Sequence, residues 1–366
     1  MSRSDGPPDQ GPLEPRHYAD PAWAQAERGR LFARSWQFVG FTDQLAEHNR
    51  FLTRQVAGVP VLVQNFDGGI RAFRNICSHR FARIHGAEQG RSMLRCPYHG
   101  WTYNADGVPV GIPRNEECFG LDRAAREGLA LKRYEVGTVG RFVFVRLEPG
   151  GPGLEEALGE HAGLLMRLSD AFDAPFSEEA VDWACDWKIG VENVLEVYHV
   201  DSVHPETFRT VAEGAWDCDA SGPHSRGRIG LTAENARWWE GMGGKLKLNA
   251  LEGLAPYHHV LLFPNLALSV TAGRLLSVQT YEPAGPGRSL LRWRLSLAKS
   301  LPGASAAARG AVTASLADFN RTVLSEDRAI CAETQIGTAA MDRPALLGRN
   351  EERIRAFHAA YRAAMA

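Results

Sequence analysis

The chain has no long uninterrupted apolar run, and its charges nearly balance. Its most apolar stretch, Val260 to Val270, contains Pro264 and Asn265 and is too short to span a bilayer. The formal net charge is −2 over 366 residues. A nucleic-acid partner would require a clustered basic excess, which this composition does not supply. We therefore expect neither a membrane-spanning segment nor a nucleic-acid partner.

Cysteine is scarce, with 6 residues in the whole chain. Four of them show no regular spacing, so the sequence does not predict a disulfide framework: Cys118, Cys185, Cys218 and Cys331. The first residues also lack the charged, apolar and small-residue order of a signal peptide. We expect these cysteines to be free thiols in a cytoplasmic protein.

No dinucleotide-binding signature is present. The segment Gly241-Met242-Gly243-Gly244-Lys245 is only superficially similar to one, because it lacks the preceding strand and the required glycine spacing. If the protein uses electrons from NAD(P)H, they must therefore reach it through a separate reductase.

The chain divides by composition into a tail and two domains. Residues 1–16 are rich in Pro, Gly and charge and are expected to form a loose tail. A helix is predicted from Pro21 to Trp36, and residues 17–35 are assigned to an N-terminal helical segment that packs on the second domain. The run Pro149-Gly150-Gly151-Pro152-Gly153 indicates the break between the domains.

Residues 36–148 are predicted to form a small β domain, and residues 149–366 an α+β domain. Short strands bounded by Gly and Asp turns are expected in the first domain at 51–57, 61–65, 70–74 and 141–147. In the second domain, strands at 260–263 and 275–281 are followed by a long Ala-rich helix over about 304–336. This mixture is typical of an antiparallel sheet flanked by helices.

Two paired motifs in the first domain predict a metal site. Cys77-x-His79 and Cys96-x-x-His99 offer two thiolates and two imidazoles. Thiolates favour iron–sulfur clusters and zinc, and two histidines in place of two cysteines at one iron define a Rieske-type [2Fe-2S] centre. A structural zinc ion is the alternative, because two Cys and two His also suit tetrahedral zinc.

A second group of metal-binding side chains lies in the second domain. Glu196 and His199 are three residues apart and would share one face of a helix. His204 lies too far around a straight helix to meet the same ion as His199. Pro205 predicts that the helix ends or bends there. Two such imidazoles and a carboxylate would make the 2-His-1-carboxylate triad of non-heme iron. On their own, the residues also fit a core histidine and a surface histidine.

Both motifs resemble those of a known protein family. Cys77-Ser78-His79-Arg80 and Cys96-Pro97-Tyr98-His99-Gly100-Trp101 resemble the cluster loops of Rieske proteins. The segment from Asp186-Trp187-Lys188 to His204-Pro205 resembles the iron motif of Rieske non-heme iron oxygenase α subunits. The resemblance implies that His199 and His204 bind mononuclear Fe(II). It also implies that Glu196 bridges this site to a Rieske histidine, His79 or His99, of a neighbouring subunit.

The same resemblance places the third iron ligand on a late helix. Asp327 matches best, with Glu326 and Glu333 as alternatives. The segment also fits a solvated run of charge on an amphipathic helix. We expect Asp327 to face inward, with Val323 and Ile330 at helical spacing beside it.

The resemblance implies an all-β Rieske [2Fe-2S] domain followed by a helix-grip-like catalytic domain. The implied function is that of a terminal oxygenase that uses O2 and NAD(P)H-derived electrons for hydroxylation, oxidative demethylation or cis-dihydroxylation. Its electrons would pass from the Rieske cluster to the Fe(II) of the neighbouring subunit. Implied partners are a reductase, with or without a ferredoxin, a small-molecule substrate and further copies in a homotrimer or an assembly of trimers. A Rieske electron-transfer protein without oxygenase activity is the alternative.

The substrate is open between a quaternary amine and an aromatic compound. Glu196, where ring dioxygenases generally carry Asp, resembles the branch that includes choline, glycine betaine and carnitine oxygenases. Four aromatic side chains would suit an ammonium group but are expected mainly to pack in the core or on the sheet: Trp238, Trp239, Tyr257 and Phe263. His258 and His259 should point to opposite faces of a strand in structural roles.

Overall fold

The computed structural model describes residues 11–366, which form two compact units. One unit contains residues 32–167 and the other contains residues 11–31 together with residues 168–366. The boundary falls later in the sequence than the Pro149–Gly153 break. Helix α5 (Leu154–Leu158) still packs on the first unit, where a Cβ on Gly137 would lie 2.8 Å from the Leu154 side chain.

The first unit is built on an antiparallel sheet with the strand order β1-β9-β8-β4-β3-β2-β5. Its strands are β1 (Gln37–Phe41), β2 (Arg50–Val56), β3 (Val59–Phe66), β4 (Gly69–Arg74), β5 (Gln89–Arg91), β8 (Arg133–Val139) and β9 (Phe142–Arg146). Successive side chains of β3 alternate between two cores, as the period of two requires. Val61 and Val63 join one core, whereas Leu62 joins a second core that also contains Cys77 and Cys96. The sheet thus supports the two loops that carry Cys77 and Cys96 through its second core.

Small elements surround these loops. They are the hairpin β6 (Thr102–Tyr103) and β7 (Pro109–Gly111), with helices α3 (Asn115–Cys118) and α4 (Arg123–Glu127). The short helix η2 (Thr42–Leu45) contacts β1 and β2. Strands β6 and β7 pair antiparallel directly after the second motif. Helix α6 (His161–Ala171) spans the boundary between the two units.

The second unit has one antiparallel sheet with the strand order β10-β16-β15-β14-β13-β12-β11. Its strands are β10 (Ser177–Trp183), β11 (Ala212–Ser221), β12 (His224–Leu231), β13 (Tyr257–Leu262), β14 (Leu266–Thr271), β15 (Leu275–Gly285) and β16 (Arg288–Leu297). The predicted α+β architecture with antiparallel sheets is confirmed. The register between β11 and β12 shifts between Glu213 and Asp217, and this irregularity contains Trp216.

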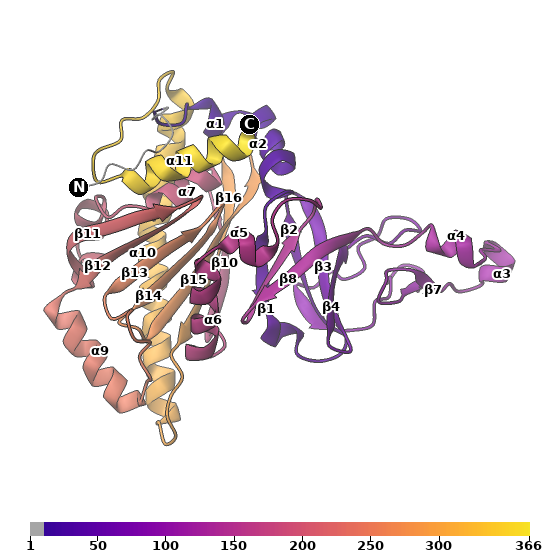
Figure 1. Cartoon of the computed structure of the whole chain (residues 1–366), viewed down its shortest axis with the longest axis horizontal. Coiled ribbons are helices and arrows are strands. Elements are labelled where there is room, and N and C mark those ends of the chain that lie inside the picture. Colours follow the sequence, from indigo (N-terminus) through magenta and orange to yellow (C-terminus); the bar gives the residue numbers. More distant parts are fainter. Residues whose placement is uncertain (1–10) are drawn as a thin grey trace. The chain divides into compact units, whose positions relative to one another are not determined.

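Helices pack on this second sheet, and Figure 1 shows the long helix α10 running against its strands. They are α7 (Trp187–Asn193), α8 (Val200–Val203), η3 (Phe208–Thr210), α9 (Ala233–Leu246), α10 (Ala306–Ala340) and α11 (Glu352–Met365). The expected Ala-rich helix corresponds to α10. The Ser305 side chain caps α10 by accepting a hydrogen bond from the Ala308 amide at 3.3 Å.

The N-terminal segment belongs to this second unit. It forms α1 (Arg16–Ala19), α2 (Pro21–Glu27) and one π-helical turn, η1 (Arg28–Phe32), so the helix ends before the expected Trp36. Its attachment is a buried ion cluster in which Lys188 lies 2.6 Å from Glu27 and 2.7 Å from Asp186. These three side chains are almost completely buried.

Residues 11–16, which we expected to belong to a loose tail, are packed. Leu13 is buried, and its amide donates a hydrogen bond to His358 at 3.3 Å. Arg362 donates to the carbonyl groups of Gly11 and Pro12. The composition argument missed these contacts because α11, which provides them, is distant in sequence. Residues 1–10 lie outside the described part of the chain.

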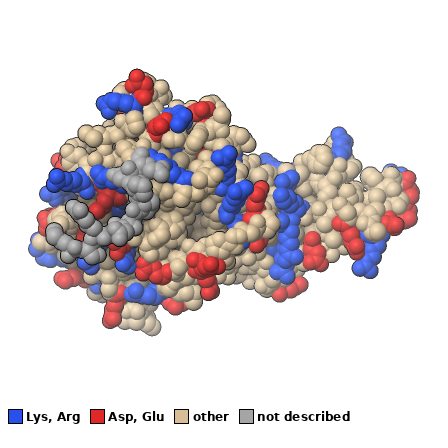
Figure 2. Space-filling view, turned by 45° about the horizontal axis from the view of Figure 1, so that its top comes forward, with Lys and Arg blue, Asp and Glu red and all other residues tan. Residues whose placement is uncertain are grey.

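The surface and the helices agree with the balanced composition. Figure 2 shows acidic and basic side chains together on the face that it displays. Within residues 11–366, none of the helices combines the length and the apolar character that a membrane crossing requires.

Candidate metal centres and substrate cavity

The loops that carry Cys77 and Cys96 in the first unit have the same pattern of backbone hydrogen bonds. In the first loop, the amide of Cys77 donates to the carbonyl of Ala82 at 2.9 Å, and Phe81 donates back to Cys77 at 3.1 Å. In the second, Cys96 donates to Trp101 at 2.8 Å, and Gly100 donates to Cys96 at 3.0 Å. Each loop therefore closes on itself next to its cysteine.

One glycine is needed for the second loop. Gly100 has φ of +75°, a conformation that L side chains rarely adopt, and a Cβ there would lie 3.0 Å from Arg95. This tight turn brings His99 round toward the first loop. The ring centroids of His79 and His99 are 4.7 Å apart.

Neighbouring side chains fix the ligand groups of these loops. The Tyr103 hydroxyl lies 3.0 Å from the sulfur of Cys77 and accepts a hydrogen bond from the Ser78 amide. The ring of His79 stacks on Trp101 at 4.9 Å. Burial, together with the nearby Cys77, raises the pKa of the Cys96 thiol, although amide hydrogen bonds oppose this effect. A bound cation would therefore be needed to hold Cys96 as a thiolate.

The chemistry of the four groups fits a two-iron cluster. Two thiolates from Cys77 and Cys96 and two imidazoles from His79 and His99 are the ligand set of a Rieske-type [2Fe-2S] centre. The same set also suits one tetrahedral zinc ion.

The second centre is positioned by a break between two helices. Helix α7 ends at Asn193, and α8 begins after His199, which is its N-cap residue. Helix α8 ends at Val203, so the expected helix end before Pro205 is confirmed. Glu196 and His199 do not share a continuous α-helix, because turns replace it between α7 and α8. They nevertheless meet, with Oε1 of Glu196 2.5 Å from Nδ1 of His199.

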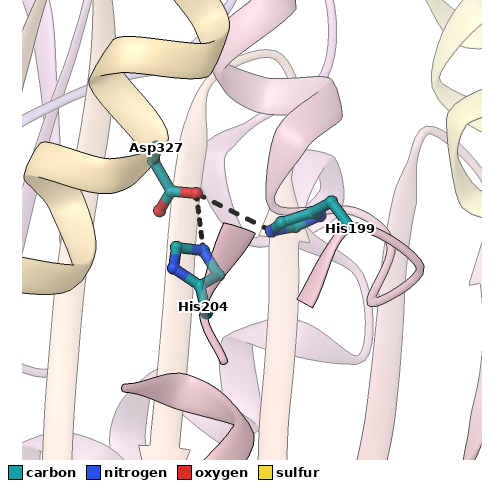
Figure 3. Close-up of side chains that lie close together, drawn as sticks. All are labelled: His199, His204 and Asp327. Carbon is teal, nitrogen blue, oxygen red and sulfur yellow. Dashed lines mark hydrogen bonds and ion pairs between the residues drawn. The ribbon is translucent and has the colours of Figure 1, made fainter. Parts of the chain in front are cut away.

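Asp327 reaches this centre from α10. Its Oδ1 atom lies 2.9 Å from Nε2 of His204 and 3.7 Å from Nε2 of His199, and Figure 3 shows both rings turned toward this carboxylate. The ligand atoms of the three residues all lie within 4.8 Å of one another. Two imidazole nitrogens and one carboxylate oxygen at this spacing fit a mononuclear iron ion with open coordination positions.

A second layer of polar groups orients these three residues. Glu326 accepts a hydrogen bond from Nδ1 of His204 at 2.7 Å and is held in turn by the Thr207 hydroxyl at 2.6 Å. Asn193 donates to Asp327 at 2.7 Å. Carboxylates on Nδ1 leave Nε2 of each histidine facing the centre and raise the basicity of the ring.

The electrostatics of His204 agree with a cation at this position. Burial by itself lowers the pKa of the ring, but the hydrogen bonds and charges of Asp327 and Glu326 outweigh it and raise the pKa above its ordinary value. The site therefore attracts positive charge, which a proton or a metal ion can supply.

A cavity of about 520 Å³ opens at this centre. Its wall includes His199, His204 and Asp327, the sheet residues Ser269 and Ser277, and side chains of α9 and α10. Trp238, Trp239 and Tyr257 also line it. The expected packing role holds as well for Trp239, which is buried, and for Tyr257, which packs against a small core cluster. Phe263 does not line it and instead contacts Phe357.

One detail of α10 differs from expectation. The inward side of the helix carries Leu324, Asp327 and Cys331, whereas Ile330 is exposed. Of the alternatives to Asp327, Glu333 is exposed and Glu326 lies on the outer nitrogen of His204. Sequence reasoning missed the roles of Asn193 and Thr207, although Asn193 stands three residues before Glu196 in the same motif.

The comparison with protein families assigns the two halves of the chain. Residues 173–366 match the ring hydroxylating alpha subunit (catalytic domain) family, and residues 35–135 match the Rieske [2Fe-2S] domain. This chain belongs to the ring-hydroxylating alpha-subunit family. The two matched domains imply a [2Fe-2S] cluster and a non-heme iron. The match of the catalytic domain leaves no support for a Rieske protein that only transfers electrons.

Relatives with assigned activities act on several small molecules. The glycine betaine monooxygenase oxygenase subunit of Pseudomonas aeruginosa is 31% identical over 57% of this chain and 47% of its own length. The N,N-dimethyl phenylurea N-demethylase subunit alpha of Sphingobium sp. is 28% identical over 79% of this chain and 72% of its own length. The chain spans about half the length of the glycine betaine and carnitine relatives that it matches.

Solved structures share the fold. A quaternary ammonium Rieske monooxygenase in complex with L-carnitine superposes with a TM-score of 0.79 at 18% identity, covering 97% of this chain and 96% of that one. Naphthalene 1,2-dioxygenase from Rhodococcus sp. gives a TM-score of 0.78 at 18% identity, covering 97% and 94%. At this level of identity the likeness establishes the architecture of the chain.

Proposed function

We propose that this chain is the terminal oxygenase of a multicomponent Rieske non-heme iron oxygenase. It uses O2 and electrons from NAD(P)H to hydroxylate, demethylate or dihydroxylate a small organic substrate. The observation that carries the proposal is the position of His199, His204 and Asp327 in the wall of a cavity large enough for such a substrate.

The chain's own residues have distinct tasks in this proposal. Cys77, His79, Cys96 and His99 hold the cluster, and His199, His204 and Asp327 hold the mononuclear iron. When bound, the cluster supplies electrons one at a time and the iron supplies a site for O2 reduction. Asn193 fixes Asp327 by its hydrogen bond, and Glu326 fixes His204.

Glu196 is proposed to connect the two centres between subunits. Its Oε1 atom is engaged with Nδ1 of His199, and its Oε2 atom accepts hydrogen bonds from the backbone amides of Tyr198 and His199. A carboxylate oxygen can accept more than one hydrogen bond. A cluster histidine, His79 or His99, of a neighbouring copy would donate to it. The expected assembly is a homotrimer or a set of trimers.

Electron supply is proposed to come from a separate NAD(P)H-dependent reductase, with or without a ferredoxin. The chain lacks the glycine-rich turn of dinucleotide-binding proteins, and the segment Gly241–Lys245 lies within helix α9. Rapid reduction of the cluster by NADH without a partner would contradict this part of the proposal.

An N-methylated compound is the proposed substrate. The glycine betaine relative and the phenylurea demethylase relative are both named for molecules with N-methyl groups. Aromatic side chains in the cavity wall, among them Trp238, Trp239 and Tyr257, provide the flat apolar faces that such groups contact.

Oxygen uptake with a generic reductase tests the proposed activity. The purified chain, NADH and a panel of N-methylated amines, ureas and aromatic acids would be incubated, with O2 consumption and product mass measured together. We expect NADH-dependent O2 uptake coupled to a product that carries one added oxygen or has lost a methyl group. A loaded protein with both metals bound and no product from any panel member would contradict it.

A further inference from the structure

The charged side chains that line the cavity are acidic, the two metal-binding histidines aside. Within the described residues, the lining contains Glu196, Glu234 and Asp327 but no Lys or Arg. Glu196 is engaged with His199, and Asp327 with His204. The third carboxylate, Glu234, is exposed and makes no ion pair within residues 11–366. A metal ion bound by Asp327 would neutralise the negative charge of that carboxylate but not the charge of Glu234.

Glu234 lies at the entrance. It is in the first turn of α9, and the other exposed lining residues lie on the same helix, on α10 and on η3. Trp238, one turn further along α9, is 39% exposed, and Phe319 of α10 is 36% exposed. A substrate that enters between these helices therefore passes a carboxylate flanked by aromatic rings.

Aromatic side chains continue inward from this entrance. The rings of Trp238 and Trp239 meet edge to face at 4.8 Å, and those of Phe208 and Tyr257 at 5.0 Å. The faces of such rings attract cations through the ring quadrupole. The sheet side of the cavity adds neutral groups, including Ser269, Ser277 and Gln279.

The buried cation Arg353 lies behind the wall. Its guanidinium donates to the hydroxyl and carbonyl of Ser225 and lies 5.5 Å from the ring centroid of Trp216. Trp216 lines the cavity whereas Arg353 does not. Arg353 therefore cannot form a direct ion pair with a carboxylate held in the cavity.

We propose that the substrate is an N-methylated organic cation without a carboxylate, and that Glu234 selects it against zwitterions. A carboxylate in this cavity would lose its hydration without gaining a cationic side chain, which is costly. The ammonium group is attracted by the faces of the aromatic rings and by the negative charge of Glu234. This inference rests on the proposed function and separates this chain from oxygenases that act on glycine betaine or carnitine.

Three matched probes test the proposal by binding. Choline is a cation, glycine betaine adds a carboxylate to the same trimethylammonium group, and 3,3-dimethylbutan-1-ol is the neutral isostere of choline. Calorimetric titration of the holoenzyme without O2 gives each Kd. We expect choline to bind at least about tenfold more tightly than either of the others.

Variants of Glu234 locate the effect. Glu234→Lys should raise the Kd of choline about two- to fivefold and lower the Kd of glycine betaine. Glu234→Gln should give Kd values between those of the parent and of Glu234→Lys. Glu240, exposed on the same helix and outside the cavity wall, provides the control variant Glu240→Lys, which should change neither affinity. Thermal unfolding of each variant checks that α9 is intact.

Several outcomes would overturn the proposal. Glycine betaine binding as tightly as choline would remove the selection against carboxylates, and equal binding of the alcohol would remove the role of charge. Absence of choline binding below about 10 mM would also overturn it. Iron and sulfide contents of the same samples report the proposed function independently, so that failure of the metal sites is distinguished from a different substrate preference.

Discussion

Oε2 of Glu326 accepts a hydrogen bond from Nδ1 of His204 at 2.7 Å. The next residue along α10, Asp327, lies 2.9 Å from Nε2 of the same ring. Two consecutive acids thus contact opposite nitrogens of one histidine. One of them faces the metal position, and the other fixes the ring that faces it.

Removing the carboxylate of Glu326 should weaken the binding of iron at this site. We expect Glu326→Ala to increase the rate of iron release to a chelator by about 10–100-fold. The release rate of Glu326→Gln should lie between those of Glu326→Ala and the parent protein. The amide oxygen of Gln can still accept from Nδ1 but carries no charge. Glu333→Ala is the matched control because Glu333 is an exposed acid on the same helix. Equal release rates for Glu326→Ala and the parent would disprove the orienting role.

Glu196→Gln should separate metal binding from electron transfer. Both metals should remain bound, since His199 and the cluster ligands are intact, while substrate oxidation should fall about 100-fold. Rapid mixing of the reduced protein with O2 and substrate, followed by cluster absorbance, gives the rate. Glu206→Gln serves as the control, as Glu206 is exposed nearby. Unchanged turnover in Glu196→Gln would rule out the bridge.

The buried cluster of Lys188, Glu27 and Asp186 predicts a stability defect. In Lys188→Met two carboxylates would remain buried without their cation, so the free energy of unfolding should fall by about 3–5 kcal/mol. Urea unfolding measures it. Adding Glu27→Gln and Asp186→Asn should restore part of the loss, because no unpaired charge then remains. A Lys188→Met protein as stable as the parent would contradict this role.

The buried side chain of His85 should make the stability of the Rieske domain sensitive to acid. Burial lowers the pKa of His85 from 6.5 to about 4, its ring stacks on Phe51 at 3.9 Å, and within residues 11–366 its Nε2 has no hydrogen-bond partner. The unfolded chain therefore binds a proton between these pH values while the folded chain does not, so stability falls as the pH drops from 6.5 to about 4.

His85→Phe keeps the ring stack and removes the titrating group. The stability difference between variant and parent should shift in favour of the variant as the pH falls through this window. Thermal unfolding at a series of pH values measures it. A difference that stays constant from pH 7 to pH 4 would show that His85 does not contribute.

Sequence reasoning succeeded where the relevant residues are close together in the chain. Cys77 and His79 share one loop, and Pro205 sets the end of the helix that precedes His204. It was less accurate where distant elements meet. Ile330 was expected to face inward beside Asp327 but is exposed, because the sheet and α7 together determine which side of α10 is covered.

The cavity wall could not be assigned from the sequence for the same reason. Trp238 and Tyr257 come from a helix and a strand that meet only in the folded unit, so their sequence positions do not reveal a shared surface. The outer role of Glu326 was also hidden. Adjacent acids on a helix point in different directions, and only the position of His204 shows which of them contacts which nitrogen.

Metal analysis of the parent protein and of Asp327→Ala distinguishes the two metal centres. We expect about three irons and two acid-labile sulfides per chain in the parent, and about two irons and two sulfides in Asp327→Ala, with an unchanged cluster EPR signal. Zinc in place of the cluster, or a full iron content retained by Asp327→Ala, would contradict this expectation.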